Sequence, residues 1–152
     1  MAGIKMDVEA LTAFLVRDFP QVCDQFVVER ITEEGLILRL VVQDGHLRPG
    51  RTVSGPAIFA LADVAVYLAI LSRLGPVALA VTTNCSIDFM RKPAAGADLL
   101  CDVRLLKLGR VLAVADCLIG PAGSTAPVAR AALTYSIPPN GPRGVPVTAP
   151  GT

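Results

Sequence analysis

The sequence predicts an α+β domain in which one curved antiparallel sheet wraps around one long apolar helix. The apolar run from Val53 to Leu74 is too long for a strand and therefore predicts a helix. Two strand-like segments precede this run and four follow it, with turn-forming residues between them. A single sheet curved around the helix is the arrangement that buries the apolar residues of both.

A short amphipathic helix is expected before the first strand. Asp7 is its candidate N-cap and Pro20 is its stop. Its apolar residues recur at steps of three and four, which places them on one helix face: Val8, Leu11, Phe14, Leu15 and Phe19.

Two strands are expected next, at 26–32 and 36–43, joined by a tight turn at 33–35. The following stretch, DGHLRPGRTVSGP, is dense in turn formers and is expected to be a loop. Four more strands are expected after the central helix, and their turns predict an antiparallel meander: 78–90, 98–106, 111–119 and 126–137.

The central helix has clear boundaries in the sequence. Ser54 is its candidate N-cap, Pro56 lies in its first turn, and Gly75 with Pro76 ends it. Apolar side chains occur on every side of it, which predicts a central position. We expect the run to be too short to span a bilayer, which takes ~20 residues, and it carries Asp63 at its centre.

The 152 residues suit one domain, which we expect to cover 1–137, and the Pro/Gly-rich tail at 138–152 is expected to be disordered or loosely attached. The net charge of +1 and the few aromatic residues disfavour nucleic-acid binding. An apolar fraction of 53% with only 18% charged residues predicts that some apolar surface is buried between subunits. The start of the chain lacks the features of a signal peptide, so a cytoplasmic location is expected.

The four cysteines are widely spaced and form no CxxC pair: Cys23, Cys85, Cys101 and Cys117. Buried reduced thiols explain them better than a disulfide framework, and no ligand cluster predicts a metal site. His46 is the only histidine and lies in the expected loop, which also disfavours a Ser-His-Asp hydrolase.

Asp63 is the residue with the most chemistry to explain. It is the only charged side chain within AIFALADVAVYLAIL, residues 57–71. A carboxylate in such surroundings must be paired, neutral or functional. It could cap a neighbouring helix end, or it could act as an acid–base group. The residues alone leave both readings open.

Three stretches carry a resemblance to a known family. RPGRTVSGPAIFALAD at 48–63 ends in Leu61-Ala62-Asp63, SIDFMRKPAAG at 86–96 contains an Arg-Lys-Pro segment, and LLKLGRVLAVADCLI at 105–119 contains a Gly-Arg hairpin. With the order of elements, they make residues 8–137 resemble the hotdog fold, specifically the PaaI-type acyl-CoA thioesterases.

The family pattern before the helix aspartate is an Asn, a glycine and then His-Gly-Gly. In this chain Gly55 matches the first glycine of His-Gly-Gly. Four positions differ from the family, because Arg48, Arg51, Ser54 and Pro56 stand where the Asn, the glycine, the His and the last glycine are expected. Arg48 and Arg51 could meet coenzyme A phosphates, pair with acidic side chains or be solvated loop residues.

The resemblance implies a thioester bound at a dimer interface, with its carbonyl oxygen at the start of the helix of one subunit and Asp63 supplied by the other. A helix N-terminus offers unpaired N–H groups that stabilise an oxyanion. The Gly55 N–H is the expected donor, since Pro56 has none. Asp63 is expected to act as a general base on water or as a nucleophile.

Further residues are expected at the substrate. The family analogy places a hydroxyl near the water at Thr82 or Thr83, although β propensity explains both equally well. It also suggests pantetheine or phosphate contacts for Arg91, Lys92 and Arg110. Phe59 and Tyr67 lie one helical turn either side of Asp63 and either shape its pocket or belong to the core.

The resulting hypothesis is a homodimeric or homotetrameric hydrolase that converts an acyl-CoA to a free acid and coenzyme A without any cofactor other than the coenzyme A of its substrate. The alternative is a non-catalytic hotdog module that binds acyl-CoA or another apolar ligand, or a dimeric scaffold. A hotdog dehydratase is a third reading, and it needs a catalytic histidine for which only His46 is present.

Overall fold

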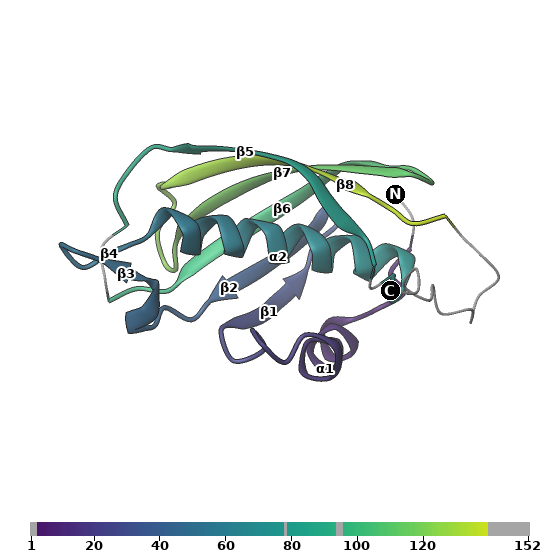
Figure 1. Cartoon of the computed structure of the whole chain (residues 1–152), viewed down its shortest axis with the longest axis horizontal. Coiled ribbons are helices and arrows are strands. Elements are labelled where there is room, and N and C mark those ends of the chain that lie inside the picture. Colours follow the sequence, from purple (N-terminus) through teal and green to yellow (C-terminus); the bar gives the residue numbers. More distant parts are fainter. Residues whose placement is uncertain (1–2, 78, 94–95, 140–152) are drawn as a thin grey trace, which may run out of the picture.

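The fold is a six-stranded antiparallel sheet curved around one long helix, as the sequence predicts (Figure 1). The computed structural model describes residues 3–77, 79–93 and 96–139. The main elements are α1 (Val8–Asp18), β1 (Phe26–Ile31), β2 (Gly35–Leu40), α2 (Gly55–Leu74), β5 (Val81–Phe89), β6 (Leu99–Leu108), β7 (Leu112–Pro121) and β8 (Ala129–Ser136).

Helix α1 forms where the sequence predicts it. The Asp7 carboxylate accepts a hydrogen bond from the Ala10 N–H at 2.9 Å, and the helix gives way to its C-cap at Phe19, just before Pro20. Its buried face, Leu11, Phe14 and Leu15, packs into the core beside β1 and α2. This helix therefore brings Phe14 and Phe19 close to the central helix.

The strand order in the sheet is β1-β2-β6-β7-β8-β5. The expected meander is correct for β6, β7 and β8, but it is wrong for β5. Strand β5 pairs with β8 at the far edge of the sheet, and β2 pairs with β6 instead. After β5 the chain contacts the stretch before α2, where the Pro93 carbonyl accepts a hydrogen bond from the Val53 N–H at 3.2 Å. β6 then pairs with β2, so β5 and β6 are neighbours in sequence but not in the sheet.

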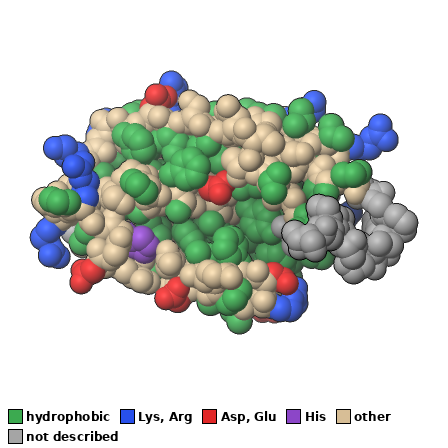
Figure 2. Space-filling view, in the orientation of Figure 1, with side chains coloured by type: hydrophobic (Ala, Val, Ile, Leu, Met, Phe, Trp, Pro, Cys, Tyr) green, Lys and Arg blue, Asp and Glu red, His purple; other side chains and the backbone are tan. Residues whose placement is uncertain are grey.

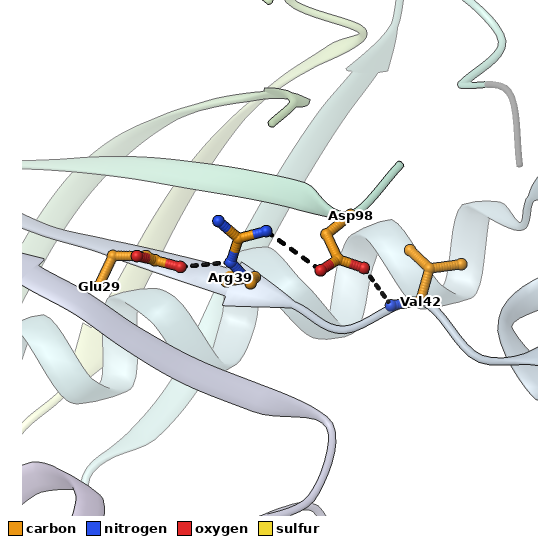
Figure 3. Close-up of polar contacts among 4 residues, drawn as sticks. All are labelled: Glu29, Arg39, Val42 and Asp98. Carbon is orange, nitrogen blue, oxygen red and sulfur yellow. Dashed lines mark hydrogen bonds and ion pairs between the residues drawn. The ribbon is translucent and has the colours of Figure 1, made fainter. Parts of the chain in front are cut away.

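A polar network holds the beginning of β6 against β1 and β2 (Figure 3). The Arg39 guanidinium donates to the Glu29 carboxylate and, at 3.1 Å, to the Asp98 carboxylate. The second oxygen of Asp98 accepts from the Val42 N–H at 3.0 Å. The two carboxylates raise the pKa of Arg39. Asp98 thus fastens the crossover chain to the end of β2.

The stretch predicted to be a loop contains short regular elements. A 3₁₀ turn at Asp44–His46 is followed by a two-stranded ribbon, β3 (Leu47–Arg48) and β4 (Thr52–Val53). His46 stabilises the turn, because its Nδ1 accepts from the Gln43 N–H at 2.9 Å and its Nε2 lies 3.0 Å from Gln25 Oε1. Both ring nitrogens are therefore engaged in structural contacts.

Helix α2 has the predicted ends but is not buried on every side. Ser54 caps it, and Gly75 ends it with φ of 88°, a conformation that glycine adopts readily. One stripe of α2 is exposed or half-buried: Pro56, Phe59, Ala60, Asp63 and Tyr67. This stripe lies beside β5, which is an edge strand of the sheet. The helix cannot be covered there by its own sheet, since the sheet ends at β5.

The expectation that the apolar run is too short to cross a membrane is wrong on length. Helix α2 has 20 residues and is long and apolar enough to span a bilayer by those criteria, but 72% of its most apolar window is buried inside the protein. The apolar composition of α2 is therefore explained by its burial under the sheet, as in a core helix.

All four cysteines are free, and only Cys101 and Cys117 are fully buried, whereas Cys23 and Cys85 are half-buried. The expected tail at 138–152 lies outside the described residues from residue 140 onward, as do position 78 of the first expected strand after α2 and positions 94–95.

Candidate functional site

Asp63 lies at the middle of the exposed stripe of α2, next to the edge strand β5. Figure 2 shows hydrophobic side chains gathered over this face with an acidic group exposed among them. The helix presents Asp63 on this side because Leu61, Ala62, Val64 and Ala65 occupy the buried faces. A half-buried carboxylate is thus held within an apolar surface and remains accessible from outside.

Two hydroxyl groups hold the Asp63 carboxylate. The Tyr135 hydroxyl lies 2.7 Å from Oδ1 of Asp63 and 2.8 Å from its backbone carbonyl oxygen. The Thr82 hydroxyl donates to the same Oδ1. Thr82 and Tyr135 are cross-strand partners in the β5–β8 ladder, so the sheet brings both hydroxyls to one point. Among the described residues, all hydrogen bonds to this carboxylate reach Oδ1 and leave Oδ2 without a donor.

Tyr135 remains a hydrogen-bond donor at neutral pH. Burial, followed by the nearby charge of Asp63, raises the pKa of Tyr135 far above its ordinary value. The phenol therefore keeps its proton and does not compete with Asp63 as a base.

An open pocket of about 570 Å³ begins at Asp63. Its apolar and aromatic wall contains Phe19 from the end of α1, Tyr67 from α2 and Tyr135 from β8, and Asp18 and Gln21 lie at its rim. Burial raises the pKa of Tyr67, and the charge of Asp18 adds to this effect. The pocket combines apolar and aromatic side chains with the Asp63 carboxylate and the hydroxyls of Thr82 and Tyr135. A few convergent polar groups in such a cavity are typical of a small-molecule site.

The start of α2 forms a separate part of the surface. The Ser54 hydroxyl accepts from the Ala57 N–H at 3.3 Å, so Ser54 is the helix cap. Gly55 lies in the first turn of α2, where backbone N–H groups have no partner within the helix. Its N–H has no hydrogen-bond acceptor among the described residues. The ring of Phe89, at the end of β5, packs over Gly55. Asp63 follows Gly55 by eight positions, which corresponds to about 12 Å along a helix.

Some of the other residues expected at the substrate lie near the pocket at Asp63 or near the start of α2. Tyr67 and Thr82 line the pocket at Asp63, whereas Thr83 is exposed and bonds to the Thr134 carbonyl. Phe59 is 42% exposed on α2 and is not part of the pocket wall. Pro56 is exposed in the first turn of α2.

The expected phosphate-binding arginines do not gather at one place. Arg48 is exposed in β3, and Arg91 follows β5 and donates to the Pro127 carbonyl at 2.6 Å. Lys and Arg side chains gather at the β3–β4 end of the molecule (Figure 2). Arg110 is exposed in the β6–β7 turn, at the opposite end of the sheet from Phe89. Arg91 and Arg110 therefore lie at opposite ends of the sheet.

Tyr135 and Phe89 are site residues that sequence reasoning missed. Both come from strands that were predicted, but the pairing of β5 with β8 was not, and this pairing places Thr82 beside Tyr135. A signal for Tyr135 was present, because it continues the inward-facing alternation of Ala129, Ala131 and Leu133 as a large polar side chain.

Comparison with known proteins agrees with this fold. Residues 50–123 match the family model of the thioesterase superfamily. No curated protein matches the sequence. A candidate thioesterase of Silicibacter sp. TM1040 is 55% identical, with a TM-score of 0.84 over 90% of this chain and 94% of that one.

Two more distant structures share the fold. The PaaI protein of phenylacetic acid degradation from Thermus thermophilus, solved as a mutant, is 27% identical, with a TM-score of 0.66 over 78% of this chain and 98% of its own. A Streptococcus mutans protein bound to acetyl-CoA is 26% identical, with a TM-score of 0.65 over 75% of this chain and 89% of its own. The family model and the 55% identical relative together show that this chain belongs to the thioesterase superfamily, with the hotdog fold.

Proposed function

We propose that the protein hydrolyses an acyl-CoA thioester to a free acid and coenzyme A. The observation that carries this proposal is the Asp63 carboxylate, which two hydroxyls hold in the wall of a pocket with aromatic side chains, in a chain of the thioesterase superfamily. The acetyl-CoA bound to the Streptococcus mutans relative supports an acyl-CoA as the ligand.

In the proposed reaction Asp63 takes a proton from a water whose oxygen bonds to the thioester carbon. The carbonyl oxygen becomes an oxyanion, which the Gly55 N–H and the positive end of the α2 dipole stabilise. The oxyanion then collapses, the C–S bond breaks, and the thiolate of coenzyme A leaves and takes up a proton. In the other route the Asp63 carboxylate itself bonds to the thioester carbon, the thiolate leaves, and water hydrolyses the resulting anhydride.

The two halves of this machinery cannot act on one thioester within a single subunit. A reacting carbonyl must lie about 3 Å from both the base-activated water and its oxyanion donor, whereas Gly55 and Asp63 are separated along the helix by about 12 Å. We therefore place the Gly55 of one subunit opposite the Asp63 of a second. The pairing surface is the exposed stripe of α2 with the open edge of β5.

Exposed apolar side chains on this surface support a second copy as its partner. They come from α2, from the chain before β5 and from β5 itself and its end: Phe59, Leu79, Val81, Phe89 and Met90. An unpaired edge strand flanked by apolar residues is a ready template for pairing with another strand. Pairing of two such dimers into a tetramer remains a prediction, as does the cytoplasmic location.

The pocket wall suggests where the parts of the substrate bind. The aromatic wall of Phe19, Tyr67 and Tyr135 suits an apolar acyl group, and Arg48 and Arg91 lie at the end of the molecule that holds the start of α2 and could meet the phosphates of coenzyme A. The reaction needs no metal or further cofactor, because carboxylate and helix end supply its acid–base and electrostatic steps.

Turnover of a panel of acyl-CoA esters, followed by thiol release, tests the proposal. We expect wild-type turnover and a loss of at least about 100-fold in Asp63→Asn, because the amide can neither take up the proton nor attack. The matched control is Asp116→Asn, an exposed aspartate on the opposite face of the sheet, which should keep wild-type turnover. Equal rates in wild type and Asp63→Asn would contradict the role of Asp63.

A non-catalytic binding module is the second candidate, and one observation favours it. Ser54 is the side chain at the helix start that could contact a substrate, but its hydroxyl already accepts the hydrogen bond that caps α2. In this case an acyl-CoA would raise the melting temperature of the protein without release of thiol, and Asp63→Asn would not change that result.

A further inference from the structure

We propose that Tyr135 is a positioning residue for Asp63, which with Thr82 holds Oδ1 in place and leaves Oδ2 for the water or the thioester. This inference rests on the proposed function, since it assigns a role within the same site. It adds Tyr135 of β8, which lies outside the helix motif around Asp63.

The Tyr135 hydroxyl contacts both ends of one residue. It lies 2.7 Å from the side-chain Oδ1 and 2.8 Å from the backbone carbonyl oxygen of Asp63. An aspartate has only two side-chain torsions, so a group that holds its carboxylate and its backbone at once restricts both of them. Thr82 then approaches the same oxygen from β5 and prevents the carboxylate from turning.

The ring that carries this hydroxyl is buried and packed against other rings. Tyr135 is 3% exposed, and its ring stacks on Tyr67 with centroids 6.3 Å apart and planes inclined by 24°. Tyr67 in turn contacts the rings of Phe14 at 6.0 Å and Phe19 at 6.5 Å. An aromatic cluster that links α1, α2 and β8 therefore fixes where the hydroxyl points.

The hydroxyl has the chemical properties that the role needs. Burial raises the pKa of Tyr135, so the group is a proton donor throughout the neutral range. A donor to a carboxylate makes a charge-assisted hydrogen bond, which is stronger than one between neutral groups. A phenylalanine would fill the same space without a polar atom to satisfy, so the core alone does not require the hydroxyl.

The test is the variant Tyr135→Phe, with kcat and KM measured on the acyl-CoA that wild type hydrolyses best. We expect kcat to fall by about 10- to 100-fold, as for loss of a group that orients a reacting residue, while KM changes by less than about threefold. Thr82→Val should give the same pattern and serves as the second variant if Tyr135→Phe does not fold. A purely structural role would change melting temperature without this split between kcat and KM.

A double-mutant cycle separates positioning from other roles. In the Asp63→Asn background, Tyr135→Phe should leave the residual turnover unchanged within about twofold, because the residue it positions is already lost. An equal loss in both backgrounds would overturn the proposal and assign Tyr135 to the substrate or the fold. Wild-type kcat in Tyr135→Phe would overturn it while the proposed function stands. Absence of wild-type turnover on the whole panel would overturn both.

Discussion

The ring of Phe89 covers Gly55 at the start of the central helix, where a Cβ on residue 55 would lie 3.4 Å from Cζ of Phe89. Phe89 is nevertheless 56% exposed, since it stands at the end of an edge strand. The proposed oxyanion donor, the Gly55 N–H, therefore lies beside an aromatic side chain that can move. The loss of the Gly55 N–H can therefore be tested separately from the contact that an added Cβ makes with Phe89.

Gly55→Pro and Gly55→Ala form a matched pair for that test. Both add a Cβ next to Phe89 and before Pro56, so both should lose a similar amount of stability, about 1 kcal/mol. Only proline removes the N–H, and proline is tolerated at the first position of a helix. Turnover of an acyl-CoA should therefore fall about 100- to 1,000-fold further in Gly55→Pro than in Gly55→Ala.

Thermal unfolding of both variants should accompany these rates. A Gly55→Pro protein that is folded and as active as Gly55→Ala would exclude this N–H as the oxyanion donor.

The pairing surface predicts a change of oligomeric state in Phe59→Glu. A carboxylate in the middle of an apolar interface must be desolvated without a partner, which costs several kcal/mol. Sedimentation velocity at micromolar concentration should show a dimer or larger species for wild type and a monomer for this variant.

The control is Leu118→Glu on the outer face of the sheet, at an apolar residue that is 56% exposed, against 42% for Phe59; this variant should keep the dimer. A wild-type monomer, or an unchanged Phe59→Glu, would contradict the proposed interface.

Asp98→Ala should destabilise the fold by about 1 kcal/mol, since it removes the acceptor for both the Arg39 guanidinium and the Val42 N–H and both lie near solvent. Urea unfolding measures this free energy. Asp88→Ala is the control, because among the described residues the Asp88 side chain pairs only with Arg130, and both side chains are more than half exposed. Its change should stay within about 0.5 kcal/mol. The same loss in both variants would mean that the Arg39 network adds nothing beyond a surface ion pair.

Stability should decline in alkaline solution because of Tyr135. Its pKa is raised in the folded state, so above pH ~10 the unfolded chain loses a proton that the folded chain keeps. This contribution is complete below pH ~10 and falls by up to about 1.4 kcal/mol per pH unit above it. Urea unfolding from pH 8 to 11 should show a shallower decline for Tyr135→Phe than for wild type, and equal slopes would exclude Tyr135 as the cause.

Tyr135→Phe will not remove the whole decline. Burial and the neighbouring Cys117 also raise the pKa of Cys101, so this thiol contributes in the same direction and from a lower pH.

The sequence by itself determined the main elements and singled out Asp63 as the candidate for the proposed chemistry. The ends of α1 and α2 follow from Asp7, Ser54 and Gly75, because capping depends on residues a few positions apart. Asp63 stood out for the same reason, as a carboxylate among its own apolar neighbours. The period-two alternation of the residues that form β6 indicated which of its side chains face the core: Leu99, Cys101, Val103 and Leu105.

Only the tertiary structure decided what surrounds Asp63. Tyr135 is 72 positions away from it in the chain and Thr82 is 19 positions away. They meet because β5 pairs with β8 rather than with β6. Strand order depends on the total burial of the sheet and helix and on the path of the connections, and no local pattern encodes it. Asp63 was therefore visible in the sequence, and the family resemblance pointed to a hydroxyl at Thr82 or Thr83. The Tyr135 hydroxyl, and the choice of Thr82 as its companion on Asp63, became visible only in the fold.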